Sequence, residues 1–259
     1  HWRKECILFF CPTFREILNV HFLKLLQRIF LKMRIIDLFS GVGGLTFGFY
    51  YRKYKDHFVR NRKNQFVFAN EYNPFENYPD IPMKNCDIKS LKESDIRKWI
   101  GSEPVDLIIG GPPCQSFSTV GQRNYDEKAQ LYTEYLRVLK IARPKMFLFE
   151  NVRGILSMRE IFYKRDAAGN ILYELKDVEG RESLTPRKKP VIDHYGKSVM
   201  EILNDQFSNL GNGLGYNIWT ERLNAMDYGV PENRERVFIV GIRNDLNLKW
   251  NCPPKEKSA

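Results

Sequence analysis

The sequence predicts an α/β protein with a mostly parallel sheet and helices on both of its faces. Short apolar runs rich in β-branched and aromatic residues recur along the chain, and stretches of helical period lie between them. Strands that alternate with helices pair in parallel, because each helix carries the chain back to the edge from which the next strand starts. The length of 259 residues and the 43% of hydrophobic residues suffice for one large domain of this kind.

The predicted elements follow one another from residue 34 onward. The first unit is a strand over 34–39, a turn over 40–44 and a helix from Leu45 to about Tyr51. These runs have either the apolar character of buried strands or apolar residues three and four positions apart. Further strands are expected at 66–69, 105–109, 146–149 and 237–242, and further helices at 131–142 and 197–207.

Two polar segments interrupt the alternation. Residues 52–63 carry six lysines and arginines, and residues 157–198 contain a predicted hairpin around 166–170 and the basic run 187–189. Both segments are expected to be surface insertions, with a contact to nucleic acid as the alternative.

Residues 1–32 are expected to form an extension outside this domain. Their apolar residues recur at helical spacing from Phe14 to Ile29, but charged residues interrupt the stretch too often for a membrane span. Met33, directly before the first strand, is a better candidate for a translation start than His1. The domain itself is expected at 33–250, followed by a polar tail at 251–259.

Charge and cysteine content limit the partners. Lysine and arginine number 41 against 31 aspartates and glutamates, and the formal charge of +10 favours a polyanionic partner. The five cysteines are odd in number and scattered, without a CxxC or Cys/His cluster. This pattern speaks against a disulfide framework or a zinc site and favours a reducing compartment. Neither a membrane nor a metal is expected.

The turn after the first strand is rich in glycine and reads DLFSGVGG at 37–44. Glycines at a strand-to-helix turn let a ligand approach the backbone. The dinucleotide fingerprint fails because Thr46 stands where its third glycine belongs, so a ligand without a pyrophosphate is favoured, such as S-adenosylmethionine. The alternative is a tight packing turn without a ligand.

Two carboxylates and an aromatic ring are predicted at neighbouring strand ends. Glu71 follows the second strand and could accept hydrogen bonds from ribose hydroxyls, with Tyr72 beside it as a face for adenine. Asp87 lies where a third strand should end and could accept from the adenine amino group. Capping and turn roles are the alternatives for these carboxylates.

The strongest signal is GGPPCQSFS at 110–118, directly after the strand at 105–109. Cys114 lies just past the carboxyl end of that strand, where α/β sheets bind ligands, and suits a nucleophile better than a buried hydrophobe. Glu150, in FENV, ends another strand and could exchange a proton with a bound base. Arg234 and Arg236 alternate before the last strand and therefore share a face. A structural Glu–Arg ion pair is the alternative, and it could coexist with the functional role.

In this order, the motifs DLFSGxGG, PPCQ, ENV and RER resemble those of the C5-cytosine DNA methyltransferase family, from Met33 to about Arg243. The resemblance implies a Rossmann-like, S-adenosylmethionine-dependent methyltransferase fold with a mostly parallel seven-stranded sheet. It also implies methyl transfer to carbon 5 of a flipped-out cytosine in double-stranded DNA through a covalent cysteine adduct. The setting would be a restriction-modification system in a bacterial cytoplasm, associated with the nucleoid.

The resemblance also assigns roles to single residues. Cys114 would be the nucleophile, Glu150 the acid or base on the target ring, and Arg236, helped by Arg234, the group that binds the oxygen of the base. The loop at 116–126 would close over the flipped cytosine. The S-adenosylmethionine site would be lined by Phe39, Ser40, Gly41, Gly43, Gly44, Leu45, Glu71, Tyr72, Asp87, Ile88, Pro113 and Leu131.

The sequence departs from the family at its end. Family members continue into a target-recognition domain, which is absent from these 259 residues, so the chain is expected to be a fragment or one subunit of a split enzyme. Alone it is expected to be inactive, or nearly so, on duplex DNA. Two alternatives stay open: a cytosine-C5 methyltransferase acting on tRNA, and a regulatory subunit without activity in the absence of its partner.

Overall fold

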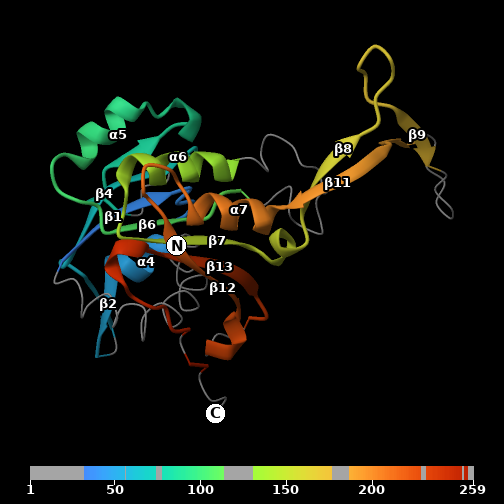
Figure 1. Ribbon diagram of the computed structural model, residues 1–259. Coiled ribbons are helices and arrows are strands. Elements are labelled where there is room, and N and C mark those ends of the chain that lie inside the picture. Colours follow the sequence, from blue (N-terminus) through green and yellow to red (C-terminus); the bar gives the residue numbers. More distant parts are fainter. Residues whose placement is uncertain are drawn as a thin grey trace.

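The computed structural model describes residues 32–55, 57–73, 78–113, 131–176, 187–228, 232–252 and 254–255. Its centre is a seven-stranded sheet with the order β12-β13-β7-β6-β1-β4-β5 (Figure 1). The strands are β1 (Met33–Leu38), β4 (Asn64–Glu71), β5 (Met83–Asn85), β6 (Leu107–Gly110), β7 (Met146–Val152), β12 (Tyr216–Asn224) and β13 (Glu235–Arg243). The first five of these pair in parallel, and β13 runs antiparallel to both of its neighbours.

Helices cover both faces of the sheet, as Figure 1 shows. Helices α5 (Glu93–Ile100), α6 (Tyr132–Ala142) and α7 (Val199–Ser208) lie on one face, and α4 (Gly44–Tyr50) lies on the other. The strands serve two cores because alternate side chains point to opposite faces. In β1, Ile36 packs with the α5–α7 side, whereas Ile35 packs with the α4 side.

The predicted fold class is confirmed, and each predicted strand and helix of the sheet domain corresponds to one in the structure. The short 3-10 helices η1 (Ile88–Ser90), η3 (Arg153–Leu156), η4 (Ala225–Tyr228) and η5 (Asn244–Leu246) complete the connections. The sequence does not predict β12 or α5. Strand β12 lies at the edge of the sheet and mixes charged with apolar residues, and α5 has a single fully buried side chain, Ile96.

The two polar segments form antiparallel ribbons, one at the amino ends of the parallel strands and the other at their carboxyl ends. Strands β2 (Tyr51–Tyr54) and β3 (His57–Arg60) form a hairpin between the end of α4 and the start of β4, at the edge where the parallel strands begin. The second ribbon pairs β8 (Arg159–Tyr163) with β11 (Ile192–Ser198) and is continued by β9 (Tyr173–Lys176) with β10 (Arg187–Pro190). We call residues 157–176 and 187–198 the arm, which projects from the edge where the parallel strands end (Figure 1).

Around residues 166–170 the structure has a turn closed by one isolated bridge, between Arg165 and Ile171, and not the predicted hairpin, because β8 pairs with β11 and β9 with β10. The backbone N–H of Asp166 donates to the carbonyl of Asn170 over 2.9 Å, and Gly169 has a φ of +85°. The side chain of Asp166 closes the turn by accepting from the backbone N–H groups of Ala168 and Asn170.

Several predictions fall outside the described residues. They are the helix proposed within residues 1–31, the thiol of Cys114 and the loop at 116–126. Within the described ranges, no helix is long and apolar enough to cross a membrane. No three His, Cys, Asp or Glu side chains gather there in a way that could hold a metal ion.

Candidate active site at the carboxyl edge of the sheet

The predicted site residues gather along one edge of the sheet. Five strands are parallel, so their carboxyl ends meet at the edge where open α/β sheets bind ligands. Strand β13 runs the other way and brings its first residues to the same edge. The site residues that follow β1, β4, β5, β6 and β7 or begin β13 and α6 are Phe39–Leu45, Glu71, Tyr72, Asp87, Ile88, Pro113, Leu131, Glu150, Arg234 and Arg236.

The glycine turn after β1 is tightly fixed. Phe39, Gly41 and Gly43 all have positive φ, of 57°, 53° and 85°. A Cβ on Gly43 would collide with the ring of Tyr78, whose hydroxyl donates to the Gly43 carbonyl over 2.8 Å. Only glycine therefore fits at position 43, both for the backbone angle and for the space.

The carboxylate of Glu71 holds this turn from the neighbouring strand. Its Oε2 accepts from the backbone N–H of Gly41 over 2.8 Å, and its Oε1 accepts from that of Asn73 over 3.1 Å. The carboxylate predicted to bind ribose thus lies directly at the glycine turn, with Tyr72 beside it and 71% exposed. An exposed ring next to this carboxylate is available to stack on an adenine.

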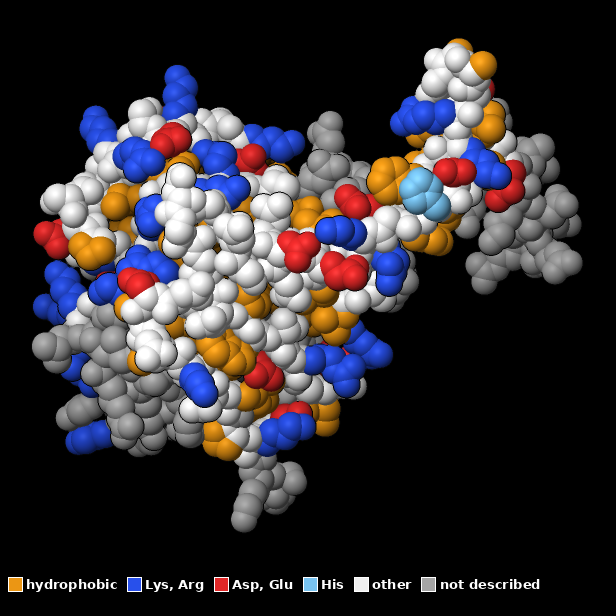
Figure 2. All heavy atoms as spheres, in the orientation of Figure 1, with side chains coloured by type: hydrophobic (Ala, Val, Ile, Leu, Met, Phe, Trp, Pro, Cys, Tyr) orange, Lys and Arg blue, Asp and Glu red, His pale blue; other side chains and the backbone are white. Residues whose placement is uncertain are grey.

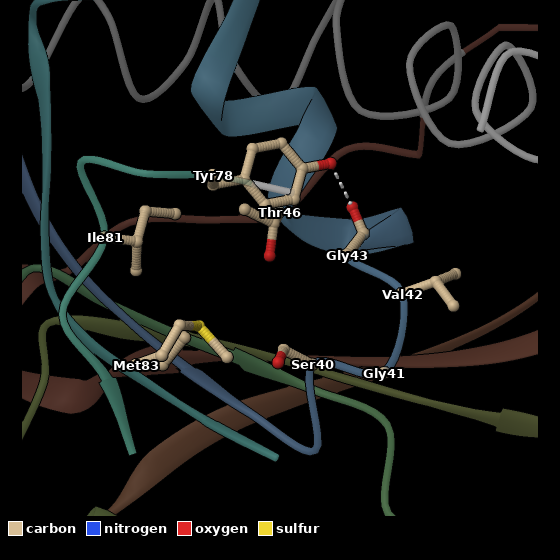
Figure 3. A pocket seen from close by; sticks show the side chains of 9 residues that line it. Ser40, Gly41, Val42, Gly43, Thr46, Tyr78, Ile81 and Met83 are labelled. Carbon is tan, nitrogen blue, oxygen red and sulfur yellow. Dashed lines mark hydrogen bonds between the residues drawn. The ribbon is translucent and has the colours of Figure 1, made fainter. Parts of the chain in front are cut away.

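A narrow cleft opens beside the turn (Figure 3). The residues that line it are Ser40, Gly41, Val42, Gly43, Thr46, Ala69, Tyr78, Ile81 and Met83. Two buried oxygens next to it, Ser40 Oγ and Asp37 Oδ1, have no hydrogen-bond partner within the described residues. Such orphaned buried oxygens are uncommon and costly, so they fit a site completed by a polar ligand.

Asp37 has an unusually high pKa for an aspartate. It is fully buried, and its Oδ2 accepts a hydrogen bond from the hydroxyl of Thr46. Loss of hydration raises its pKa to about 7, the Thr46 hydrogen bond lowers it, and the charge of Glu71 raises it further. A neutral carboxyl can therefore persist here near neutral pH.

Asp87 and Ile88 show only part of the predicted arrangement. The Asp87 side chain is exposed and accepts from the backbone N–H of Lys89, so it caps η1. The Ile88 side chain is 3% exposed and belongs to the core, and its carbonyl accepts from Arg137 over 2.9 Å. Any contact of Ile88 with a ligand would therefore come from its backbone, and the capping alternative for Asp87 applies.

The segment before Cys114 is held against β7. A Cβ on Gly111 would lie 2.7 Å from Glu150 Oε2, so the glycine lets the two strand ends come together. The side-chain amide of Asn151, which is buried, donates to the Pro112 carbonyl over 3.2 Å. The chain therefore enters position 114 from a point fixed directly beside Glu150.

Glu150 and Arg236 form an ion pair across two strands. Glu150 lies opposite Phe238 in the β7–β13 ladder, so Arg236, two residues before Phe238, shares its face. Arg236 Nε is 2.9 Å from Glu150 Oε1, and each side chain is about a fifth exposed, at 21% and 20%. The ion pair expected as the structural alternative is therefore present. A functional role for the same two residues stays a prediction.

Burial outweighs the arginines in setting the proton affinity of Glu150. Loss of hydration raises its pKa, while the charges of Arg236 and Arg234 and the hydrogen bond from Arg236 lower it. The net shift is upward, so the protonated fraction near neutral pH exceeds that of an ordinary glutamate. This is the property that a proton donor to a bound base requires.

The structure adds residues that the sequence reasoning missed. They act by positioning: Gly110, Gly111, Asn151, Thr46 and Tyr78. A Cβ on Gly110 would lie 2.6 Å from the Leu38 carbonyl, so β6 can approach β1 at this point only without a side chain. Three of these residues could have been found from the sequence because they adjoin a motif: Gly110 and Gly111 precede the PPC motif, and Asn151 follows Glu150.

Comparison with known proteins now decides the family. The model for C-5 cytosine-specific DNA methylases matches residues 33–178 and 189–259, which is most of the chain. The chain belongs to this family. The resemblance deduced from the four motifs is thereby confirmed.

Individual relatives agree with this assignment. Type II methyltransferase M.FnuDI of Fusobacterium nucleatum is 35% identical over 222 residues, which are 83% of this chain and 48% of the relative. Type II methyltransferase M.AquIA of Picosynechococcus sp. is 32% identical over 86% of this chain and 77% of the relative. The chain spans about half the length of three of the curated relatives it matches, at 48%, 44% and 51%.

A solved structure confirms the methyltransferase fold. It is a prophage-encoded protein of E. coli described as a DNA modification methyltransferase, 28% identical with a TM-score of 0.55. The match covers 85% of this chain and 49% of that protein. The Rossmann-like fold predicted for this methylase chain is therefore shown, whereas the roles of its single site residues remain predictions.

Proposed function

We propose that this chain is the catalytic core of an enzyme that transfers a methyl group from S-adenosylmethionine to carbon 5 of cytosine in DNA. The observation that carries the proposal is the arrangement at the carboxyl edge. Gly111 and Pro112, the raised-pKa carboxyl of Glu150 and the guanidinium of Arg236 converge there, at the same edge as the glycine turn and its cleft. The Type II methyltransferases among the relatives support a place in a restriction-modification system.

The residues at the cleft suit S-adenosylmethionine. The orphaned oxygens Ser40 Oγ and Asp37 Oδ1 offer partners for polar groups, and Glu71 and Tyr72 offer a carboxylate for ribose and a face for adenine. When bound, this cofactor supplies an electrophilic methyl group on a sulfonium. We assign its binding to the carboxyl edge beside the glycine turn, with Phe39–Leu45, Glu71, Tyr72, Asp87, Ile88, Pro113 and Leu131 around it.

The chemistry explains why a cysteine is needed. Carbon 5 of cytosine is too weak a nucleophile to accept a methyl group unaided. Addition of the Cys114 thiolate to carbon 6 forms a C–S bond and gives carbon 5 enamine character. After transfer, loss of the carbon 5 proton expels the thiolate and restores the aromatic ring.

Glu150 and Arg236 would stabilise the electron density that this addition places on the base. Glu150, in its protonated form, would donate its proton to N3, and Arg236 would donate hydrogen bonds to the exocyclic oxygen. Binding of the base would replace part of the existing ion pair between them. Arg234 contributes its charge to the same face.

We infer double-stranded DNA as the substrate and the bacterial cytoplasm, near the nucleoid, as the setting. A stacked base cannot reach the sheet edge, so the target cytosine would be flipped out of the helix at a cost of a few kcal/mol. Reading of the target sequence is assigned here to a further region or a separate recognition subunit. The support is that the matched region is only about half of several relatives.

Trapping tests the proposal. With a recognition region supplied by fusion or in trans, duplex DNA with 5-fluorocytosine in place of cytosine should form a covalent adduct with the chain in the presence of S-adenosylmethionine, because fluorine cannot leave carbon 5 as the proton does. Cys114→Ser should abolish the adduct and methyl transfer while calorimetry shows nearly unchanged cofactor binding. An adduct with tRNA and none with DNA would overturn the DNA assignment, and full turnover in the Cys114→Ser variant would overturn the mechanism.

A further inference from the structure

The arm is an ordered structure anchored to the core. At its base the backbone N–H of Val199 donates to the carbonyl of Met158 over 2.9 Å, and both side chains are buried. Further out, Lys164, Leu172 and Val191 exchange backbone hydrogen bonds of 2.8 to 2.9 Å. These bonds join the turn at 166–170 to the ribbon, so the arm keeps a defined shape away from the sheet.

The base of the arm adjoins the candidate active site. Strand β7 carries Glu150, and only η3 and a short turn separate its end from β8. Arg153, in η3, pairs with Glu235 at 3.2 Å, and Glu235 is the neighbour of Arg236. A molecule held at the site therefore lies next to the base of the arm.

Both faces of the ribbon expose aromatic side chains. Phe162 and His194 pair across β8 and β11, and their rings stack with centroids 4.5 Å apart and planes 12° apart. Tyr195 pairs with Ile161 on the other face, since neighbouring residues of a strand point to opposite sides. Phe162 is 46% exposed and Tyr195 is 59% exposed.

Exposed aromatic rings continue beyond the ribbon. Tyr173 is 57% exposed and Leu172 is 42% exposed. Burial raises the pKa of Tyr163, and the nearby Tyr173 and Tyr195 raise it further. Figure 2 shows hydrophobic side chains at the surface along the whole projecting arm, among charged ones.

The segment that contains the arm is slightly basic. Residues 157–198 include nine lysines and arginines against seven aspartates and glutamates. Among the described carboxylates, Asp166 closes the turn and Asp193 lies 2.8 Å from His194. The remaining excess of cations suits a phosphate backbone.

We propose that the arm enters a groove of duplex DNA beside the target cytosine. A two-stranded ribbon matches the width of the major groove, about 12 Å. A groove contacts a ribbon on both faces, which fits the exposure of aromatic rings on both, whereas a flat protein partner would cover one face. The inference rests on the proposed function, because that function places DNA at the base of the arm.

The length of the arm fits a contact beside the target site. The family model matches up to residue 178 and resumes at 189, so most of the described arm lies within the matched ranges. The five residues of β8 at about 3.3 Å each give the ribbon a reach of about 16 Å, or about five base pairs. An arm of this reach spans the base pairs next to the flipped cytosine.

The test measures DNA affinity of the full chain by fluorescence anisotropy with a labelled mixed-sequence duplex of about 30 base pairs, which is three helical turns. Phe162→Ala combined with Tyr195→Ala should weaken binding by about tenfold, because the apolar contacts of both rings with base edges in the groove, such as thymine methyl groups, are lost. Tyr195→Phe is the matched control and should bind like the wild type. Lys164→Gln with Arg165→Gln should lower the slope of log Kd against log salt by about 1.8.

A second measurement locates the contact directly. Ultraviolet crosslinking to a duplex with 5-bromouracil, followed by trypsin digestion, should attach DNA to peptide 160–164, 166–176 or 189–197. Crosslinks confined to other peptides, or affinity unchanged in the aromatic double variant, would overturn the proposal. Arm variants that alter self-association in sedimentation but not DNA binding would show a protein-contact surface instead.

The outcomes separate the arm from the proposed function, because methyl transfer does not enter the binding measurement. Unchanged affinity in the arm variants, with Cys114-dependent transfer, refutes the arm proposal alone. Arm-dependent DNA binding, without any transfer even when a recognition region is supplied, refutes only the function. No DNA binding by the wild-type chain overturns both.

Discussion

Buried polar side chains at the two ends of the parallel strands, here called the amino edge and the carboxyl edge, can differ in whether their oxygens have hydrogen-bond partners. At the amino edge, Asp106 is buried and fully engaged: its Oδ2 accepts from the Arg34 backbone N–H over 2.8 Å, and its Oδ1 lies 2.7 Å from Lys145 Nζ. At the carboxyl edge, Asp37 and Ser40 each keep a buried oxygen without a partner among the described residues. Asp106 is thus satisfied where the sheet is only held together, whereas Asp37 and Ser40 keep unsatisfied oxygens where a ligand is expected.

The two ribbons repeat this contrast. The β2–β3 hairpin lies at the amino edge, and Arg60 there donates to the carbonyls of Tyr50, Asn61 and Asn64. The arm lies at the carboxyl edge and exposes aromatic rings on both faces. Both segments are basic in sequence, so the proposed contact of the arm with DNA rests on its position at the carboxyl edge and not on the amount of charge.

The largest effect is expected from the acid of the carboxyl edge. Glu150→Gln keeps an acceptor for Arg236 but cannot donate a proton to the base, so the rate of methyl transfer should fall by about a hundredfold or more. The melting temperature should change little, as measured by calorimetry. Glu232→Gln is the matched control at the same edge, because that carboxylate is exposed and 3.7 Å from Arg234. Turnover within threefold of the wild type in Glu150→Gln would contradict the assignment.

The second effect concerns pH and Asp37. Its folded-state pKa of about 7 lies above the ordinary value of 3.8, so its contribution to stability is fully present below about pH 4 and is lost as pH rises through 7. The loss amounts to about 4 kcal/mol. Asp37→Asn should remove most of this dependence, as seen by urea unfolding at pH 5 and pH 8. Parallel pH profiles for the variant and the wild type would exclude the shifted carboxyl.

At the amino edge, a substitution should lower stability and leave methyl transfer unchanged. Asp106→Ala leaves the Lys145 ammonium and the Arg34 N–H without their acceptor and should lower the free energy of unfolding by about 3 kcal/mol. Methyl transfer per folded molecule should stay unchanged. Asp245→Ala, which removes an ion pair with Arg243 that is 60% exposed on the aspartate side, is the control and should cost about 1 kcal/mol or less. Loss of activity without loss of stability in Asp106→Ala would break the contrast between the edges.

The smallest effect is expected from the amino-edge ribbon. Arg62→Gln with Lys63→Gln removes two exposed cations next to β3 and should change DNA affinity by less than about twofold, since they lie away from the active edge. The same anisotropy assay measures it beside the arm variants. A drop as large as that of the arm variants would mean that net charge, not position, governs DNA binding.

The sequence predicts the central architecture because the buried strands are continuous apolar runs. Strand β6 and the first four residues of β7 need no long-range information, since both faces are covered and these residues form buried runs without polar side chains. The half-exposed β12 and the charged α5 lack that signal, because their character comes from the neighbours they pack against.

The site is predicted in its residues but not in its pairings. Each motif carries a local signal at a strand end, which is why Glu71, Glu150 and Arg236 are found from sequence. The Glu150–Arg236 contact depends on the register of β13 against β7, which no local pattern specifies. The arm escapes prediction for the same reason, because β8 and β11 are polar and far apart in the chain.

The place of β13 between β7 and β12 also has a consequence for folding. Among the seven strands of the sheet it is the last to be synthesised, yet it lies between β7 and β12. Domains fold as the chain emerges from the ribosome, so β7 presents an unpaired backbone edge until residues 235–243 arrive. Arg236 arrives with them. The closure of the sheet and the pairing of Glu150 are therefore one event, and a nascent chain that stalls before β13 has an open sheet edge and an incomplete catalytic site.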